Sequence, residues 1–259
     1  MTKVMLTAVP MTETALKKGY FTAATKILVI TMSLSSSLGA VIMPRTSNLI
    51  AENKMDEFKV LIQKSYDFIL ALATPLTVGL IFTSPSVILL LSGESFAPAI
   101  LTSQIVALNI LMVGISGVMG LQVLYPMGRI NIVILCTFIG AVVNVVLNVL
   151  LIPVYGHNGT AVAYMLAEVA VTVSMFIVGR RYIPIQFFKK QHFHYIGGGI
   201  VMGGFLYFIS LLGLSNIYTL ITMICVGIMV YIIVLLWLKD SIGMVILSII
   251  WRKMKCRFQ

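Results

Sequence analysis

Long apolar runs dominate the chain, and short polar segments separate them. Runs of about 20 residues begin near Tyr20 and recur until Leu238. Each is long enough to cross the ~30 Å hydrocarbon core of a bilayer as a helix. Transmembrane strands would instead be segments of about ten residues with alternating polar positions. The pattern therefore predicts an all-α polytopic membrane protein, with about seven transmembrane helices that form one bundle.

The polar segments and prolines divide the chain. Proline is expected to end the first span at Pro44 and the fourth at Pro153, because it lacks a backbone donor and clashes with the preceding turn. Residues 52–66 have the pattern of a separate amphipathic surface helix. Residues 1–19 are interpreted as the remnant of a preceding helix and outer loop, residues 20–238 as the bundle, and residues 239–259 as a basic amphipathic cytoplasmic tail. The expected spans are 20–43, 67–91, 98–124, 130–152, 160–178, 195–214 and 217–238.

The composition excludes a soluble enzyme. The 259 residues are 59% hydrophobic and 10% charged, whereas soluble domains have about 25% charged residues. Three cysteines without paired spacing predict neither a disulfide framework nor a zinc site. The sequence has no GxxxxGK[ST] phosphate-binding loop, and we find no credible Ser-His-Asp or paired-carboxylate constellation. We therefore predict a protein that is not an enzyme and uses no cofactor and no metal.

The basic residues predict the orientation. Fourteen of the 18 Lys and Arg residues follow the first, third and fifth expected spans or lie in the tail, and the loops after the second, fourth and sixth spans have none. Short cytoplasmic loops carry such an excess of basic residues. We therefore expect a cytoplasmic C-terminus, and we attribute the net charge of +10 to orientation and not to nucleic-acid binding. An odd number of spans with residues 1–19 outside fits a piece of a longer transporter.

Four stretches, in order along the chain, resemble the polysaccharide-exporter branch of the multidrug/oligosaccharidyl-lipid/polysaccharide superfamily. The most specific runs from Asn144 through the motif Leu-Ile-Pro-Val-Tyr-Gly-His-Asn-Gly-Thr to Glu168. The other three comprise residues 3–6 with 19–27, residues 43–75, and residues 92–99. The resemblance implies the second lobe of a 12- to 14-helix flippase that has two bundles around a central cavity. The chain departs from the family pattern at Thr2, where an acidic residue is usual.

The function that the resemblance implies is transport by alternating access. The substrate would be an undecaprenyl-diphosphate-linked oligosaccharide repeat unit, which is moved across the bacterial cytoplasmic membrane for exopolysaccharide or capsule biosynthesis. The implied partners are the lipid bilayer, the lipid-linked oligosaccharide, and a glycan polymerase with its glycosyltransferases. A missing N-terminal half or a second copy of the chain would supply the other bundle.

Lys26 is the first candidate for substrate binding. It lies about six residues inside the first expected span, and Ser33 and Ser37 follow on the same helical face. A charge inside a membrane span usually faces a cavity or a partner, although a lysine at this depth can also reach the outer interface. The resemblance favours a cavity, because lipid II flippases, more distant relatives, are similar in having an arginine at this point. A cation there would attract a diphosphate.

Polar residues of the fourth and fifth spans are further candidates. Asn144 and Asn148 either bind substrate or bridge to neighbouring helices, and the same alternatives hold for the third-span residues Gln104, Asn109 and Gln122. Glu168 is either an ion or proton site, or a carboxyl that ties two helices together. As a proton site it would favour a cation-coupled multidrug antiporter. A third possible function is a non-transporting scaffold for glycan assembly.

Two further motifs receive structural interpretations. Gly199 and Gly203 form a GxxxG pattern that predicts a close-packing surface on the sixth span. His192 and His194 lie in a basic loop, and we expect both to be solvated side chains that bind no metal.

Overall fold

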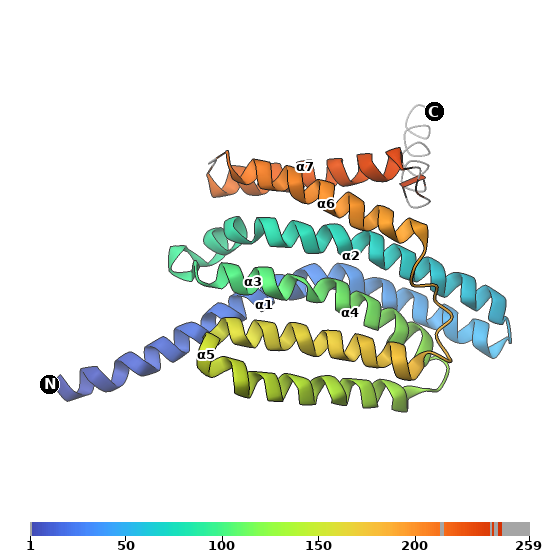
Figure 1. Ribbon diagram of the computed structural model, residues 1–259, viewed down its shortest axis with the longest axis horizontal. Coiled ribbons are helices and arrows are strands. Elements are labelled where there is room, and N and C mark those ends of the chain that lie inside the picture. The colour runs from blue at the N-terminus through green and yellow to red at the C-terminus, as the bar shows by residue number, and fades with distance from the viewer. Residues whose placement is uncertain (1, 213–214, 239, 241–242, 245–259) are drawn as a thin grey trace.

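The computed structural model of the chain is an elongated helical bundle (Figure 1). It describes residues 2–212, 215–238, 240 and 243–244, and within these residues it contains no strand. The elements are α1 (Thr2–Ala51), α2 (Met55–Ser92), the short 3₁₀ turn η1 (Glu94–Phe96), α3 (Ala99–Ala107), α4 (Asn109–Gly117), the π-helical η2 (Val118–Leu124), α5 (Ile130–Gly179), α6 (Lys190–Ser210) and α7 (Asn216–Trp237).

Seven membrane-length segments make up the bundle. Among the described residues, five helical stretches are long and apolar enough to span a membrane, namely α2, Ala99–Leu124, α5, α6 and α7. Helix α5 contains two of the expected spans, because Gly156 has φ 56° and ψ −130° and breaks it into two arms. Only glycine adopts such a conformation at low cost. Together with α1, these segments confirm the all-α fold that the sequence predicts.

Three predicted helix boundaries were wrong. Helix α1 passes through Pro44 and ends at Ala51, and the first arm of α5 passes through Pro153. Membrane helices tolerate an interior proline, because neighbouring helices and Ser or Thr side chains satisfy the freed carbonyl groups. Residues 55–66 form no separate surface helix. They are the first turns of α2. Phe58 and Ile62 are fully buried in the bundle, so this segment does not lie on the membrane surface.

Helix α2 is the central element of the bundle. It packs against α1, α3 and α4 on one side and against α6 and α7 on the other, as its position in Figure 1 shows. One apolar cluster includes Leu28 of α1, Leu80 of α2 and Ile110 of α4, and another joins α2 to Tyr195 of α6 and Tyr231 of α7. The α6–α7 hairpin therefore attaches to the rest of the chain mainly through α2.

Buried hydrogen bonds link the central helices. The Ser65 hydroxyl of α2 donates to Gln122 Oε1 of η2 at 2.5 Å, and Gln104 Nε2 of α3 donates to the Ile81 carbonyl of α2 at 3.1 Å. Bonds of this kind between membrane helices contribute about 0.6 kcal/mol on average. The bridging interpretation is thus confirmed for Gln104 and Gln122. Asn109 differs, because its amide is fully buried and has no hydrogen-bond partner within the described chain.

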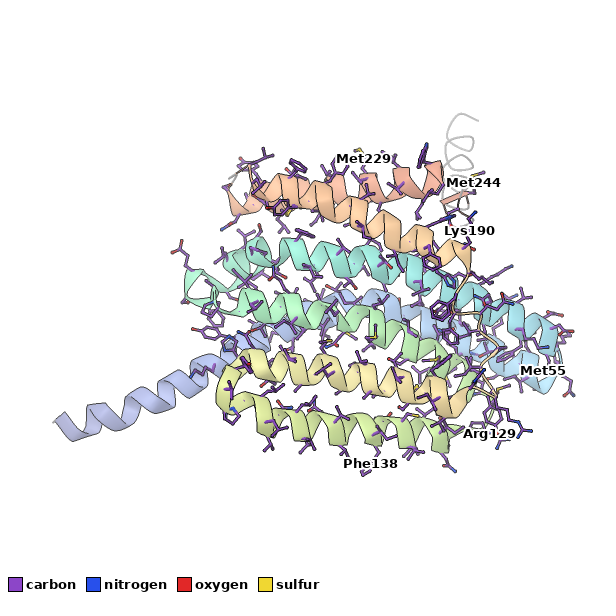
Figure 2. All side chains as sticks on the ribbon, viewed as in Figure 1. Met55, Arg129, Phe138, Lys190, Met229 and Met244 are labelled. Atoms are coloured by element: carbon purple, nitrogen blue, oxygen red, sulfur yellow. The ribbon has the colours of Figure 1, made fainter. Side chains whose placement is uncertain are left out.

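The basic loops lie at one end of the bundle. Met55, Arg129 and Lys190, which mark the connections after the first, third and fifth spans, all appear at the right-hand end in Figure 2. We call this the basic end, defined by residues 45–64, 125–130 and 180–190. These three connections thus lie on the same side of the bundle. The predicted cytoplasmic orientation assumes this arrangement, because it assigns the basic loops after alternate spans to one side of the membrane. Most of the tail predicted over residues 239–259 lies outside the described residues.

Candidate functional site

The polar stripe of α1 consists of Lys26, Ser33 and Ser37, and it lies on the outward face of the helix. All three residues are exposed, whereas Ala24 and Leu28 on the opposite face are fully buried. The eleven residues from Lys26 to Ser37 correspond to about 16 Å along a helix. The stripe is therefore a long polar surface that points away from the core of this chain.

Large apolar side chains surround the polar stripe. Val29, Ile30 and Val41 are 63%, 68% and 74% exposed. The Ser33 hydroxyl donates to the Ile30 carbonyl at 2.7 Å, one turn earlier in the same helix. None of the three stripe residues lines a cavity described below. The expected hollow beside Lys26 is therefore not enclosed by the described part of this chain.

Behind the stripe lies a small cavity of about 90 Å³ between α1, α2, α4 and η2. Met32 and Gly39 of α1 line it, together with Ile69, Gly114 and Gln122. The amide of Gln122 is the main polar group there, and its oxygen already accepts the bond from Ser65. The cavity is too small and too apolar to admit a charged headgroup.

The structure brings Asn144 and Asn148 together on the first arm of α5. Asn148 Nδ2 donates to the Asn144 carbonyl at 2.9 Å and to Asn144 Oδ1 at 3.0 Å. Both residues are half-buried. The described bonds of the Asn148 amide thus lie within one helix and do not bridge two helices, because residues four positions apart face each other on a helix.

Glu168 is half-buried on the second arm of α5. One turn later, the Thr172 hydroxyl donates to the Met112 carbonyl of α4 at 3.2 Å and to the Glu168 carbonyl at 2.8 Å. The contact that joins α4 and α5 at this level is thus made by Thr172. Glu168 and the asparagine pair lie on separate arms of α5, and the stripe lies on α1.

An apolar groove runs between α2 and α6, with a volume of about 540 Å³. Thr74, Val78 and Phe82 of α2 and Gly199 and Gly203 of α6 are among its lining residues. A Cβ atom added at Gly199 would lie 2.8 Å from Thr74 Cγ2, and one at Gly203 would lie 3.3 Å from Phe82 Cε2. The predicted close-packing role of the GxxxG pattern is confirmed for both glycines.

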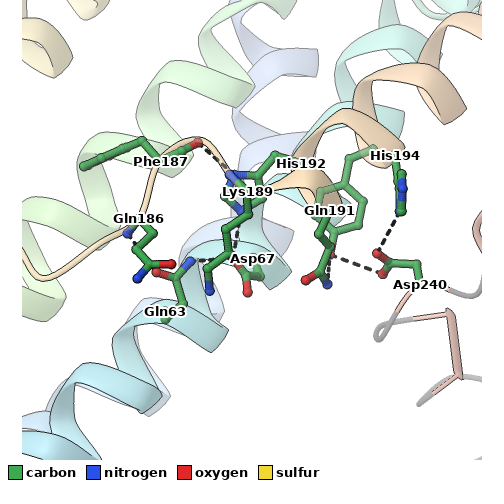
Figure 3. Close-up of polar contacts among 10 residues, drawn as sticks. Gln63, Asp67, Gln186, Phe187, Lys189, Gln191, His192, His194 and Asp240 are labelled. Carbon is green, nitrogen blue, oxygen red and sulfur yellow. Dashed lines mark hydrogen bonds and ion pairs between the residues drawn. The ribbon is translucent and has the colours of Figure 1, made fainter.

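A partly buried polar cluster ties α6 to α2 at the basic end (Figure 3). His192 Nε2 lies 2.9 Å from Asp67 Oδ1, and the two side chains are 6% and 13% exposed. Gln63 Nε2 donates to the same Asp67 oxygen at 2.7 Å, and the Gln186 backbone N–H donates to Gln63 Oε1 at 2.8 Å. We call Gln63, Asp67, Gln186, Phe187 and His192 the basic-end cluster.

A second carboxylate extends this arrangement toward the end of α7. The Tyr195 hydroxyl donates to Asp240 Oδ1 at 3.3 Å, and Gln191 Nε2 donates to the Tyr195 hydroxyl at 2.8 Å. His194 Nδ1 lies 3.7 Å from Asp240 Oδ2. The Asp240 side chain is 1% exposed, so these contacts lie in the interior beside the cluster.

The expectation that His192 is a solvated side chain was wrong. The ring is buried beside Tyr66 of α2, whose ring centre lies 5.3 Å from that of His192. The Tyr66 ring lies at the same distance from the Phe187 ring. The sequence indicates a basic loop at this position, but Asp67 lies 125 residues away in sequence. The one sequence feature that could have indicated this contact was the position of Asp67, a charged residue at the start of an expected apolar span.

Comparison with known proteins gives the family. The sequence profile described as "Lipid II flippase MurJ" matches residues 20–235. The chain belongs to the MurJ lipid II flippase family. A solved structure of the lipid II flippase MurJ, in an inward closed conformation, has the same fold with a TM-score of 0.74 and 18% sequence identity. A comparison with curated proteins gave no match.

Family membership settles part of what the sequence predicted. Two predictions are confirmed: that the chain belongs to the flippase superfamily, and that it is a multi-pass membrane protein. The family matched is that of lipid II flippases, rather than the polysaccharide-exporter branch. The MurJ-like fold covers 87% of this chain and 48% of the solved flippase. The chain thus spans about half the length of that flippase and corresponds to a single lobe of seven membrane-length segments.

Proposed function

We propose that this chain forms one lobe of a flippase that carries a polyprenyl-diphosphate-linked saccharide across the bacterial cytoplasmic membrane. The observation that carries the proposal is the cation of Lys26 on the outward polar stripe of α1. Charged side chains within membrane spans face a protein interior or a water-filled cavity. Since this chain leaves the stripe uncovered, a second lobe would cover it and complete the cavity. A second copy of the chain or a separately encoded half could supply that lobe.

Within such a cavity, Lys26 would bind the diphosphate. An ammonium attracts a phosphate group strongly where the effective dielectric constant is low. Ser33 and Ser37 would offer hydroxyl groups along the same path, and Asn144 and Asn148 remain candidates for contacts with the saccharide. Alternating access then requires the two lobes to rock about the bound headgroup. Glu168 is a candidate proton or ion site for driving that motion.

The family match supports lipid II as the substrate. An undecaprenyl-linked oligosaccharide repeat unit has the same diphosphate and the same class of lipid tail, so it remains the second candidate. A binding site built on Lys26 would accept both, and selection would depend on contacts with the saccharide. For a repeat-unit substrate, a glycan polymerase and glycosyltransferases would be the functional partners.

A transport assay with both substrates tests this proposal. The chain is reconstituted into proteoliposomes alone and with any co-purifying half, and flipping of fluorescent lipid II and of a labelled repeat unit is followed. We expect Lys26→Ala to lower the rate about ten- to a hundredfold, because a hydrogen bond to a charged group contributes about 1.5–3 kcal/mol. Lys26→Arg should retain flipping.

Lys59→Ala is the matched control, because Lys59 is an exposed lysine paired with Asp56 at the basic end. It should flip at the rate of the unmodified chain. Normal flipping by Lys26→Ala would contradict the assignment of Lys26. Dye efflux that Glu168→Gln abolishes would instead favour a cation-coupled antiporter.

A further inference from the structure

The imidazole ring of His192 lies between two hydrogen-bond acceptors. Nε2 is 2.9 Å from Asp67 Oδ1, and Nδ1 is 2.8 Å from the Phe187 carbonyl oxygen. A neutral imidazole has one N–H group, whereas an imidazolium has two. Only the protonated ring can donate to both acceptors at once. A protonated ring would therefore satisfy both acceptors, which a neutral ring does not.

The neutral ring has a different set of contacts at the same position. The backbone N–H of Lys189, the residue that precedes α6, lies 3.3 Å from Nδ1. A ring protonated at Nε2 alone would keep its bond to Asp67 and accept this N–H at Nδ1. The lone pair on Nδ1 would then point at the Phe187 carbonyl oxygen, and the two electron-rich atoms would repel each other. Loss of the proton thus exchanges the bond to Phe187 for a longer bond to Lys189.

The charged and titratable groups around the ring come from each neighbouring element. Helix α2 contributes Asp67 and the phenol of Tyr66, and α6 contributes Tyr195, whose ring centre is 6.3 Å away. Beyond Tyr195 lie Asp240, which follows the end of α7, and His194 of α6. Lys64, Lys189 and Lys190 lie close in sequence to Asp67 or His192, and Lys64 and Lys190 are exposed to solvent. Within the described contacts, His192 is the basic side chain that faces the carboxylate of Asp67.

Three segments meet at His192. Asp67 and Gln63 belong to α2, Gln186 and Phe187 belong to the connection 183–189, and His192 lies in the first turn of α6. Ile183 and Ile185 of the connection are also buried in the bundle. Beyond this point, α6 faces α2 across the apolar groove and through glycine contacts. The basic-end cluster is thus one polar attachment of the α6–α7 hairpin to α2, and the Tyr231 hydroxyl of α7, which donates to the Ala71 carbonyl of α2 at 2.9 Å, is another.

We propose that His192 is a proton-binding site that latches the connection 183–189 and the α6–α7 hairpin onto α2. With the proton bound, the ring holds the Phe187 carbonyl and the Asp67 carboxylate together. When the proton leaves, the ion pair and the bond to Phe187 are lost, and the hairpin loosens at the basic end. The latch stands on these contacts alone, so it does not depend on the proposed flippase activity.

The direction of the pH dependence follows from the contacts. The latched state requires an imidazolium, and imidazole groups change charge between about pH 5 and 8. The latch should therefore be closed below that range and loosened above it.

Distance measurements on the full chain in lipid nanodiscs test the latch. Spin labels are placed at Val60 of α2 and Trp237 of α7, which are 54% and 82% exposed, after the native cysteines are replaced by serine. We expect a narrow distance distribution at pH 5.5 that broadens by pH 8.5. His192→Gln, which keeps a hydrogen-bonding group but does not titrate, should remove this change. His194→Gln is the matched control and should retain it.

Two outcomes would overturn the proposal: a distribution in the unmodified chain that does not change with pH, or a pH response that persists in His192→Gln. If His192→Gln does not fold, ¹⁵N chemical shifts of histidine in the unmodified chain decide the matter. They should show a doubly protonated His192 at pH 5.5 and a neutral ring at pH 8.5. A neutral ring at both values would refute the latch. Both measurements use no substrate, so a failed flipping assay leaves them interpretable.

Discussion

The polar stripe of α1 and the basic-end cluster both contain ionisable side chains, but these side chains lie in opposite surroundings. Lys26 is exposed on the outward face of a membrane helix, whereas His192 is buried and contacts the half-buried Asp67 at 2.9 Å. Both regions carry charge within a largely apolar protein. In the cluster, this chain supplies the partners of each charge. At the stripe it leaves the surface uncovered.

The difference separates two uses of charge in a membrane protein. A charge whose partners lie within the same chain fixes the position of its helices, and removal of one partner leaves the other buried and uncompensated. A charge on an uncovered face contributes little to the folding of its own chain, and it is available to a ligand or to a second lobe. Stability and transport should therefore respond differently to substitutions in the two regions.

The largest loss of stability is expected for Asp67→Ala. The substitution would leave the His192 ring, whose side chain is 6% exposed, and the half-buried Gln63 amide without their shared acceptor. Breaking a buried pair in this way costs about 3–5 kcal/mol. The free energy of unfolding, measured by titration with denaturing detergent, should fall by about that amount. Asp56→Ala is the control, because Asp56 pairs with Lys59 at an exposed position and should change stability little. An equal loss in both variants would contradict the contrast.

The sequence was sufficient to predict the fold class and the number of membrane-length segments, because apolar runs of about 20 residues leave few alternatives to helices. The sequence predicted the positions of the helix ends poorly. Pro44 and Pro153 lie inside helices, and the actual break between the fourth and fifth spans is at Gly156. The backbone at Gly156 has a positive φ, and a single sequence does not show which of several glycines adopts it.

The polar contacts were predictable only where they follow local spacing. Asn144 and Asn148 are four residues apart, so their contact could be inferred from helix geometry. The pairing of Asp67 with His192 depends on how the connection 183–189 crosses the end of the bundle. Sequence spacing does not show that path, and the histidine was therefore interpreted as solvated.

The second prediction concerns Gly199, which lines the apolar groove between α2 and α6. In Gly199→Val, the new Cβ atom would lie 2.8 Å from Thr74 Cγ2 and would push α6 away from α2. Overpacking of this kind costs about 1–3 kcal/mol. Gly204→Val is the matched control, since nothing lies within 4 Å of a Cβ atom at Gly204. If the same detergent titration shows equal losses, α6 does not depend on close contact with α2.

A smaller loss is expected for Gln122→Ala, which removes a buried bond between α2 and η2. The Ser65 hydroxyl would lose its acceptor at 2.5 Å. Side-chain hydrogen bonds between membrane helices contribute about 0.6 kcal/mol on average and reach about 1.7 kcal/mol. A fall in unfolding free energy of about 1 kcal/mol should result. Gln122→Ala combined with Ser65→Ala should lose less than the sum of the single changes. Strict additivity would show that this bond contributes nothing.

The smallest effect on stability is expected for Lys26→Ala, although this variant should lose the most transport. The side chain is exposed on the outward face of α1, and surface substitutions away from special features change stability by about 0.5 kcal/mol or less. Alanine also has a higher helix propensity than lysine. The unfolding free energy of the variant in detergent should match that of Lys59→Ala. A loss as large as that of Asp67→Ala would show that the ammonium supports the fold of its own lobe, and the distinction between stripe and cluster would then be wrong.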